Sequence, residues 1–279
     1  MLRFIMNKYE KILLSDWSNC LNKNIQVELY PGYQLVLDYL EWDSHFFNRP
    51  SYFLNTDQSL FAREKLNFSD IRQINLVIPP FVIWAKLPLN TDPSFVENYQ
   101  NLGAKFVETE INLRYFNQFV KSNLKPNVES VDCIKAFHTS FKGFSELGNE
   151  FYLTRFHRDQ QIDKKLANNL WVNYFNNFRC NRPDKHVFLA LENQLVVGAI
   201  LISETNSNLI IDVAVIKSQK QGKGIGSYLM QTVIDWCLPT GKTITVSSQH
   251  RNVQAVNYYI KMGFSVFDPP RDVFHWWNK

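Results

Sequence analysis

The spacing of hydrophobic and polar residues in the second half of the chain predicts a three-stranded meander followed by alternating helices and strands. Three runs rich in aliphatic and β-branched residues, at about 186–191, 195–203 and 209–216, are separated by the turn-forming segments ENQ and NSN, as in an antiparallel meander. Apolar residues then recur at helical spacing: Tyr228, Leu229, Val233, Ile234 and Cys237. Pro239 and Gly241 end that helix, and the strand KTITVSSQ and the helix NVQAVNYYIKMGF, closed by Gly263, follow it.

A glycine-rich loop, SQKQGKGIGS at 218–227, joins the third strand to the first of these helices. It has the form Gln221-x-x-Gly224-x-Gly226, with Lys220 and Lys223 beside it. In such a turn, main-chain N–H groups and the positive end of the helix dipole form an anion site, and glycine lets a phosphate approach closely. A plain turn with glycines for its geometry is the alternative. The spacing fits neither a P-loop nor, after a meander, a Rossmann fingerprint.

Composition and charge narrow the class of protein. The chain has 279 residues and is 45% hydrophobic, enough for a packed core in one or two domains, and no run reaches the roughly 18 apolar residues of a membrane span. The net charge of +4, with scattered Lys and Arg, favours a small anionic ligand over nucleic acid. The cysteines stand singly, so we expect no metal site, no disulfide scaffold and a reducing cytoplasm. The interrupted apolar run at the start does not resemble a signal peptide.

This order of strand, Gln-x-x-Gly-x-Gly loop, helix, strand and helix resembles the GNAT family of acetyl-CoA-dependent N-acetyltransferases, whose pyrophosphate loop has the pattern Gln/Arg-x-x-Gly-x-Gly/Ala. The resemblance covers roughly residues 130–279. It implies an α/β (α+β) fold with a central mixed, mostly antiparallel sheet. It also implies direct transfer of an acetyl group from acetyl-CoA to an amine, without an acyl-enzyme and without a metal. A non-catalytic acyl-CoA-binding module is the alternative of a different class.

The resemblance assigns residues to acetyl-CoA. In the family, the strand before the loop, here Leu209–Ile216, splays from the next one, here Lys242–Gln249, and the cofactor arm lies between them. A main-chain N–H near Val215 would polarise the thioester carbonyl. The loop residues expected to bind the cosubstrate are Gln221, Gly222, Lys223, Gly224, Ile225, Gly226 and Ser227. Asn252 opens the following helix, where it can contact the cofactor arm, cap the helix, or do both.

By the same resemblance, Tyr259 is the candidate catalytic residue, protonating the departing CoA thiolate. It lies seven positions after Asn252, two helical turns, so both side chains project from one helix face. Tyr258 is the rival, since a one-residue slip would exchange the two, but it points about 100° away on an ideal helix. Packing alone is the structural alternative for either ring. The sequence assigns no general base.

The first half of the chain contains a faint copy of the last strand–helix–strand unit. With Tyr99 placed over Tyr259, Gly103 falls on Gly263, and FVIWAKL stands where TITVSSQ does. Coincidence is the alternative, because helix–Gly–strand is a common unit. The copy has no Gln-x-x-Gly-x-Gly loop, so it should not bind a pyrophosphate in the same way. We expect it to form a smaller GNAT-like domain that makes up one wall of the acceptor pocket. The polar stretch 117–130 predicts domains at 1–125 and 126–279, and the first 38 or so residues have no assigned role.

Two further stretches suggest the acceptor. LEWDSHFF, 40–47, and FYLTRFHRDQQIDKKLANNLWVNYFNNF, 151–178, resemble the GNAT branch typified by dTDP-fucosamine acetyltransferase, which acetylates the 4-amino group of a nucleotide-linked 4,6-dideoxyhexose. The resemblance implies a small-molecule nucleotide-sugar substrate for a cell-surface glycan. A peptide N-terminus, a polyamine or an aminoglycoside is the alternative acceptor, and a homodimer remains open.

Five residues could bind that acceptor through aromatic faces or charge: Trp42, Asp43, Phe47, Arg155 and His157. Each has a structural alternative. The aromatic residues of WDSHFF, Phe46 among them, can belong to the core. Arg155 can pair with Asp159 one helical turn on, and His157 can cap or pack.

Overall fold

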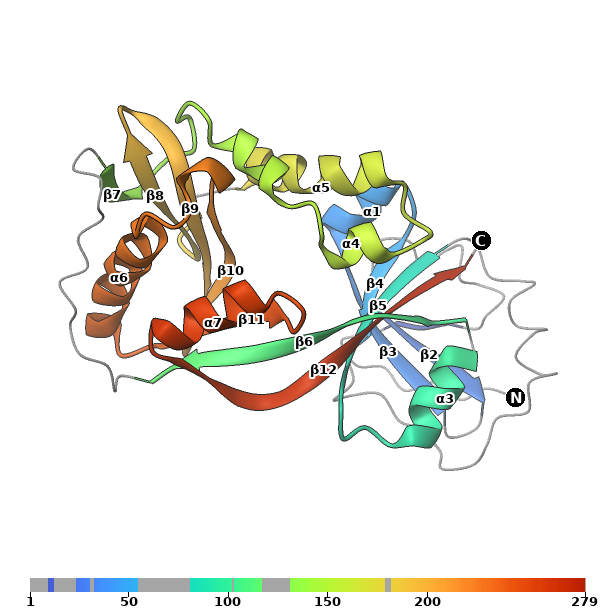
Figure 1. The fold of residues 1–279 in the computed structure, drawn as a ribbon. Helices are drawn as coiled ribbons and strands as arrows, with labels where there is room; N and C mark the ends of the chain where they lie inside the picture. The colour runs from blue at the N-terminus through green and yellow to red at the C-terminus, as the bar shows by residue number, and fades with distance from the viewer. Residues whose placement is uncertain are drawn as a thin grey trace. The chain divides into compact units, whose positions relative to one another are not determined.

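The structure is a computed structural model that describes residues 10–12, 24–30, 33–54, 81–101, 103–116, 131–178 and 182–278. The chain forms two compact units: unit 1 contains Met1–Thr109 and Pro270–Lys279, and unit 2 contains Glu110–Pro269. Strands β6 (Lys105–Tyr115) and β12 (Phe264–Asn278) each begin in one unit and end in the other (Figure 1). Unit 1 is therefore discontinuous in sequence, whereas the sequence places one boundary after residue 125. The stretch 117–130 lies outside the described residues.

Unit 2 is built on a mixed, mostly antiparallel sheet. Its strands are β7 (Val131–Ala136), β8 (Lys185–Glu192), β9 (Leu195–Glu204), β10 (Asn208–Ile216) and β11 (Thr243–Gln249). They follow the order β7-β8-β9-β10-β11, and the second half of β6 continues the sheet beside β11. Only the β10–β11 pair is parallel among these neighbours. The predicted meander and the predicted fold class are thus confirmed.

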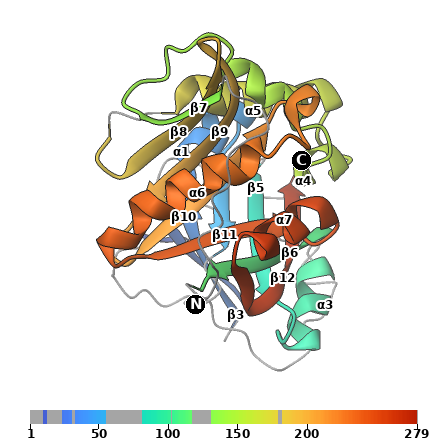
Figure 2. The same cartoon turned by 60° about the vertical axis from the view of Figure 1, so that its left-hand side comes forward.

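Helices cover both faces of the unit 2 sheet. Helices α6 (Ile225–Cys237) and α7 (Val253–Lys261) pack on the face that carries Ile200 and Ile202, and Figure 2 shows α6 crossing β8, β9 and β10. Helix α5 (Lys164–Asn177) packs on the face that carries Ala199 and Leu201. Because both faces are buried, β9 is apolar at almost every position, unlike a strand with one wet face. The remaining short helices are η2 (Ser145–Glu150), α4 (Arg155–Arg158), η3 (Ser218–Lys220) and η4 (Leu238–Thr240).

Unit 1 repeats the strand–helix–strand arrangement of unit 2. Its elements are β1 (Glu10–Ile12), β2 (Ile25–Tyr30), β3 (Tyr33–Tyr39), α1 (Glu41–Phe47), β4 (Ser51–Leu54), β5 (Phe81–Pro88) and α3 (Pro93–Asn101). Strands β4 and β5 are parallel and α3 leads into β6, just as β10 and β11 are parallel and α7 leads into β12. Gly103 and Gly263 follow the two helices with φ of 108° and 90°, values that favour glycine.

Each unit also receives one strand from the other half of the chain. The end of β12 pairs antiparallel with β5 in unit 1, and the end of β6 pairs antiparallel with β11 in unit 2. Each of these added strands occupies the same place, beside the second strand of the parallel pair. The internal repeat that the sequence suggests is therefore present, with its last strands exchanged.

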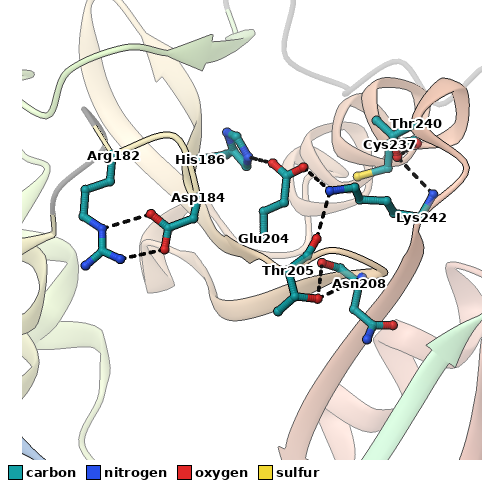
Figure 3. A network of polar contacts seen from close by, with 9 residues as sticks. All are labelled: Arg182, Asp184, His186, Glu204, Thr205, Asn208, Cys237, Thr240 and Lys242. Carbon is teal, nitrogen blue, oxygen red and sulfur yellow. Dashed lines mark hydrogen bonds and ion pairs between the residues drawn. The ribbon is translucent and has the colours of Figure 1, made fainter.

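A polar network joins the starts of β8 and β11 to the end of β9, at the end of the sheet opposite the glycine-rich loop (Figure 3). The Glu204 carboxylate accepts hydrogen bonds from Lys242 Nζ and His186 Nε2, and Lys242 Nζ also donates to the carbonyl oxygen of Thr205 at 2.8 Å. These contacts, that of Lys242 first, hold the pKa of Glu204 below its ordinary value.

Replacing Glu204 with Gln is expected to lower the free energy of unfolding by about 0.5–1 kcal/mol at neutral pH, the size of a partly exposed ion pair. A carboxyl whose folded pKa is depressed contributes stability that is lost as the pH falls through that pKa. The gap between wild type and Glu204→Gln should therefore close in acid, as measured by urea denaturation. Asp184→Asn, which breaks the exposed Arg182–Asp184 pair, is the control and should change little. Equal losses in both variants would contradict this role of the network.

Candidate functional site

The loop between β10 and α6 has a backbone that only glycine adopts easily at two positions. Gly222 and Gly224 have φ of 76° and 80°, and Gly224 is the residue that precedes the first turn of α6. The side chain of Gln221 donates from Nε2 to the carbonyl oxygen of Ile216 at 2.9 Å. Gln221 therefore ties the loop to the end of β10, so that the turn keeps a fixed shape.

The loop presents a run of main-chain N–H groups. The first helical hydrogen bond of α6 runs from Tyr228 N to the carbonyl oxygen of Gly224, at 3.0 Å. Within the described residues, the N–H groups from Gly222 to Ser227 donate to no protein acceptor. No acidic residue lies in the first turn of α6. These donors, at the positive end of the helix dipole, have the arrangement of an anion site and can bind the phosphates of a ligand.

The lysines near the loop have different environments. Lys217 lies 3.1 Å from Glu146, and Lys220 pairs with Glu192. Lys223 makes no ion pair with any residue that the structure describes. Of the three, Lys223 is therefore the cation available to an anionic ligand.

Strands β10 and β11 part beside this loop. Their parallel pairing runs from Asn208–Thr243 to Ile211–Val246 and stops there, and β10 has a bulge between Ile211 and Val213. Beyond that point β10 remains paired with β9, and β11 remains paired with β6. The splay expected between the two strands is present in unit 2.

Where β10 separates from β11, the main-chain N–H groups of β10 that would face β11 have no partner among the described strands. Lys217 N donates to the carbonyl oxygen of Val197 at 2.8 Å. Since N–H groups alternate along a strand and Val215 pairs with Ala199, the N–H of Val215 faces β9. The N–H groups of Ala214 and Ile216 face the opposite way, towards the parting. The donor expected near Val215 is therefore best placed at Ala214.

The two adjacent tyrosines of α7 have different partners. Tyr258 donates its hydroxyl hydrogen to the carbonyl oxygen of Gly226 at 2.7 Å, so its proton is engaged by the first turn of α6. Tyr259 is 6% exposed and packs against Phe264, with 5.6 Å between ring centroids. Its hydroxyl makes no hydrogen bond to a described residue, and burial raises the pKa of this phenol. The hydroxyl proton of Tyr259 is thus retained and makes no hydrogen bond to a described residue, whereas that of Tyr258 is donated to Gly226.

Asn252 caps α7, because its Oδ1 accepts a hydrogen bond from Ala255 N at 3.1 Å. Its amide nitrogen makes no hydrogen bond with a described residue, so the capping role leaves this donor available. Asn252 therefore has the capping role that the sequence offered as an alternative. This role is compatible with a contact between its amide nitrogen and a ligand.

The acceptor candidates lie in two different units. In unit 1, Phe47 is buried and stacks edge-on with Trp84 and Trp277 at 5.6 and 5.5 Å, so it belongs to the core. Asp43 is partly exposed on α1, and the side chain of Trp42 lies outside the described residues.

Arg155 and His157 lie on α4 of unit 2. His157 Nδ1 accepts from Thr154 N at 3.2 Å, and Nε2 lies 2.9 Å from Asn168 Oδ1, so both ring nitrogens serve the start of this helix and its link to α5. The Arg155 guanidinium lies 4.7 Å from the Phe156 ring, and its Nε is buried without a hydrogen bond among the described residues.

Two positions in β10 carry information that the sequence analysis passed over. The side chain of Ala214 gives no indication of a role in the sequence, because the group that faces the parting of β10 and β11 is its main-chain N–H. The side chain of Asp212 does stand out in the sequence, because Asp212 is the only charged residue in the apolar run LIIDVAVI. It lies at the bulge of β10. An acidic residue in an otherwise apolar run is a recognisable departure from the pattern.

Neither a metal cluster nor a membrane-spanning helix is found in the described part of the chain. No group of three or more His, Cys, Asp or Glu side chains there is arranged to hold a metal ion. No helix there has the length and apolarity needed to cross a membrane.

A family model supports the interpretation of unit 2. The model of the acetyltransferase (GNAT) family matches residues 147–264, which include the β10–α6 loop, β11 and α7. The chain therefore contains an acetyltransferase domain of the GNAT family, as its resemblance to that family suggests.

Individual relatives are distant. The spore coat polysaccharide biosynthesis protein SpsD of Bacillus subtilis (strain 168) is 25% identical over 118 residues, which are 42% of this chain and 40% of that protein. The match thus spans less than half of the curated relative.

Solved structures share the fold along most of the chain. A functionally unknown conserved protein from Staphylococcus epidermidis ATCC 12228 has a TM-score of 0.61 at 13% identity, covering 94% of this chain and 98% of that one. A tandem GNAT protein from the clavulanic acid biosynthesis pathway has a TM-score of 0.56 at 11% identity, with coverage of 88% and 79%. A GCN5-related N-acetyltransferase from Sphaerobacter thermophilus has 0.57 at 13% identity, with coverage of 88% and 77%. These similarities agree with a GNAT-like arrangement in both halves.

Proposed function

We propose that this protein is an N-acetyltransferase that moves an acetyl group from acetyl-CoA to the amino group of a nucleotide-linked amino sugar, a dTDP-linked 4-amino-4,6-dideoxyhexose. The observation that carries the acetyl-CoA part is the row of uncommitted N–H groups from Gly222 to Ser227 beside the parted strands β10 and β11. The sugar part is supported by the likeness of LEWDSHFF and FYLTRFHRDQQI to the amino-sugar branch of the family. A distant relative whose name places it in polysaccharide biosynthesis adds to this.

The proposed cofactor contacts use groups of fixed position. The N–H groups of the loop and the ammonium of Lys223 would bind the pyrophosphate, and the N–H of Ala214 would donate to the thioester carbonyl oxygen as negative charge develops there. The amine would attack this carbonyl carbon directly. Tyr259, whose proton is retained at neutral pH, would protonate the departing sulfur.

The two described thiols of unit 2, Cys133 and Cys237, fit a mechanism without an acyl-enzyme. Burial is the main cause that raises the pKa of Cys133 and of Cys237 to about 12. Because the thiolate is the nucleophilic form, neither of these thiols is activated for attack on a thioester. We place the reaction in the cytoplasm, which suits free thiols.

The nucleotide-linked sugar is expected to be a far better substrate than the free amino sugar. Binding energy from the remote nucleotide would hold the amine against the thioester, so losing it should lower kcat as well as raise KM, and kcat/KM should fall. The measurement is thiol release from acetyl-CoA with dTDP- and UDP-linked 4-amino sugars, the free sugars, peptides and polyamines. Equal kcat/KM on the free sugar, or preference for a peptide or polyamine amine, would remove the sugar-nucleotide proposal and leave the acetyltransferase class in place.

A further inference from the structure

Asp212 lies at the point where β10 leaves β11. The last residue pair between the two strands is Ile211–Val246, and the bulge that contains Asp212 follows at once. A bulge re-aims side chains and ends pairing, and bulges are frequent beside active sites. Asp212 is two residues before Ala214, whose N–H faces the parting. The backbone of Asp212 thus lies at the closed end of the region where the strands separate, and its carboxylate is turned towards Ser203 on β9 and Lys185 on β8.

The contacts of Asp212 leave one carboxylate oxygen available. Ser203 Oγ donates to Asp212 Oδ2, and Lys185 Nζ lies 3.7 Å from the same oxygen and also donates to Ser203 Oγ. Asp212 Oδ1 accepts no hydrogen bond from a described residue. The side chain of Asp212 is 21% exposed, so Oδ1 can be reached from solvent. One oxygen is therefore anchored and the other is unoccupied.

Asp212 faces the side of the sheet opposite to Tyr259. Its partner Ser203 follows Leu201 by two residues on β9, and Leu201 packs with α5, so Ser203 shares that face. Tyr259 packs with α6 and the other face. An amine that approaches from the α5 side and a sulfur that leaves towards α7 would meet separate groups on the two sides of the parting.

We propose that Asp212 is the general base of the reaction, an inference that rests on the proposed acetyltransferase function. As the amine nitrogen bonds to the thioester carbon, Asp212 Oδ1 takes the proton that this nitrogen loses. The C–S bond breaks, and the sulfur takes the proton of Tyr259. Solvent then removes the proton from Asp212 and restores one to Tyr259, so the net products are the acetamide and CoA thiol.

The surroundings of Asp212 make its carboxylate a stronger base than an exposed aspartate. Burial raises the pKa of its carboxyl, while the hydrogen bond from Ser203 on β9 and the charge of Lys185 on β8 act in the opposite direction. On α5, burial and then the charge of Asp212 raise the pKa of Tyr174, so this neighbouring phenol stays neutral. Lys185 is the nearby cation that limits the rise in the pKa of Asp212. Changing Lys185 should therefore change the basicity of Asp212 without altering its carboxyl group.

The main test is Asp212→Asn, assayed with acetyl-CoA and dTDP-4-amino-4,6-dideoxyhexose over a range of pH. Rates are expressed per neutral amine, using the pKa of the acceptor measured by NMR, so that the titration of the acceptor is removed. For wild type, kcat/KM should then fall as the pH drops through the raised pKa of Asp212. The variant should bind acetyl-CoA normally by calorimetry, lose about 10²-fold in kcat/KM and lack this fall. Asp184→Asn, a carboxyl on the surface, is the matched control and should behave like wild type.

A second variant tests the same carboxyl without changing it. Lys185→Met removes the cation, so the pKa of Asp212 should rise and the fall in kcat/KM should move to higher pH. Asp212→Asn with full activity, or a fall that survives in Asp212→Asn and does not move in Lys185→Met, would overturn the assignment while leaving the acetyltransferase function intact. A wild-type protein that releases no thiol with any acceptor would instead remove the proposed function, and this inference with it.

Discussion

Replacing Tyr259 with Phe should lower kcat by about 10²–10⁴-fold, the range of a lost general acid, while the fold and the acetyl-CoA affinity stay unchanged. The ring fills the same space against Phe264, so the packing of α7 is kept. Only the hydroxyl is lost, and this hydroxyl has no hydrogen-bond partner among the described residues. Stopped-flow thiol release and calorimetry with acetyl-CoA would measure the two effects separately.

Tyr258→Phe is the matched control for this prediction, because it removes the neighbouring hydroxyl. Its loss breaks the hydrogen bond to the carbonyl oxygen of Gly226, so it should weaken acetyl-CoA binding slightly and leave kcat nearly unchanged. Reversed effects would mean that Tyr258 is the acid and that the family alignment is displaced by one residue. If neither substitution slowed turnover, the acid would have to be another group.

Gly224→Val should weaken acetyl-CoA binding by about 10²-fold or more. A side chain at this position blocks the approach of phosphate to the loop N–H groups, and each charge-assisted hydrogen bond lost is worth about 1.5–3 kcal/mol, or roughly tenfold to a hundredfold in affinity. The substitution also strains the backbone, because φ is 80° at Gly224. Calorimetry with acetyl-CoA on the folded variant measures the loss.

Gly241→Val separates backbone strain from the loss of the phosphate site. Gly241 has φ of 69°, and an added Cβ would meet no atom within 4 Å, so it shares the left-handed conformation but lies at the far end of α6. Both variants should lose about 1–2 kcal/mol of stability. Only Gly224→Val should lose acetyl-CoA affinity, and unchanged affinity in that variant would show that the loop does not bind the pyrophosphate.

The parts of unit 2 that local patterns encode were predictable from the sequence. The meander from β8 to β10 follows from apolar runs broken by turn residues, and the start of α6 follows from glycines at Gly222 and Gly224, where positive φ is required. The internal repeat was detectable for the same reason, since Gly103 and Gly263 each end a helix.

Features set by long-range pairing or by single hydrogen bonds were not predictable in this way. The exchange of β6 and β12 depends on which strand edges meet, and a strand carries no local mark of its partner. The bulge at Asp212 changes which residues of β10 face β9 and which face the parting. From the sequence, the N–H donor that faces the parting could therefore be predicted only near Val215, and not assigned to Ala214. His157 caps its helix through Nδ1 and Thr154, a pairing outside the usual Ser/Thr-x-x-Glu pattern.

The most direct test of the account is to incubate the purified protein with acetyl-CoA and dTDP-4-amino-4,6-dideoxyhexose, and to follow CoA thiol release and the sugar product by mass spectrometry and NMR. We expect one thiol released for each acetyl group gained, with the acetyl group on the 4-amino nitrogen of the sugar. A protein that binds acetyl-CoA but releases no thiol with this or any other amine in the screen would contradict it.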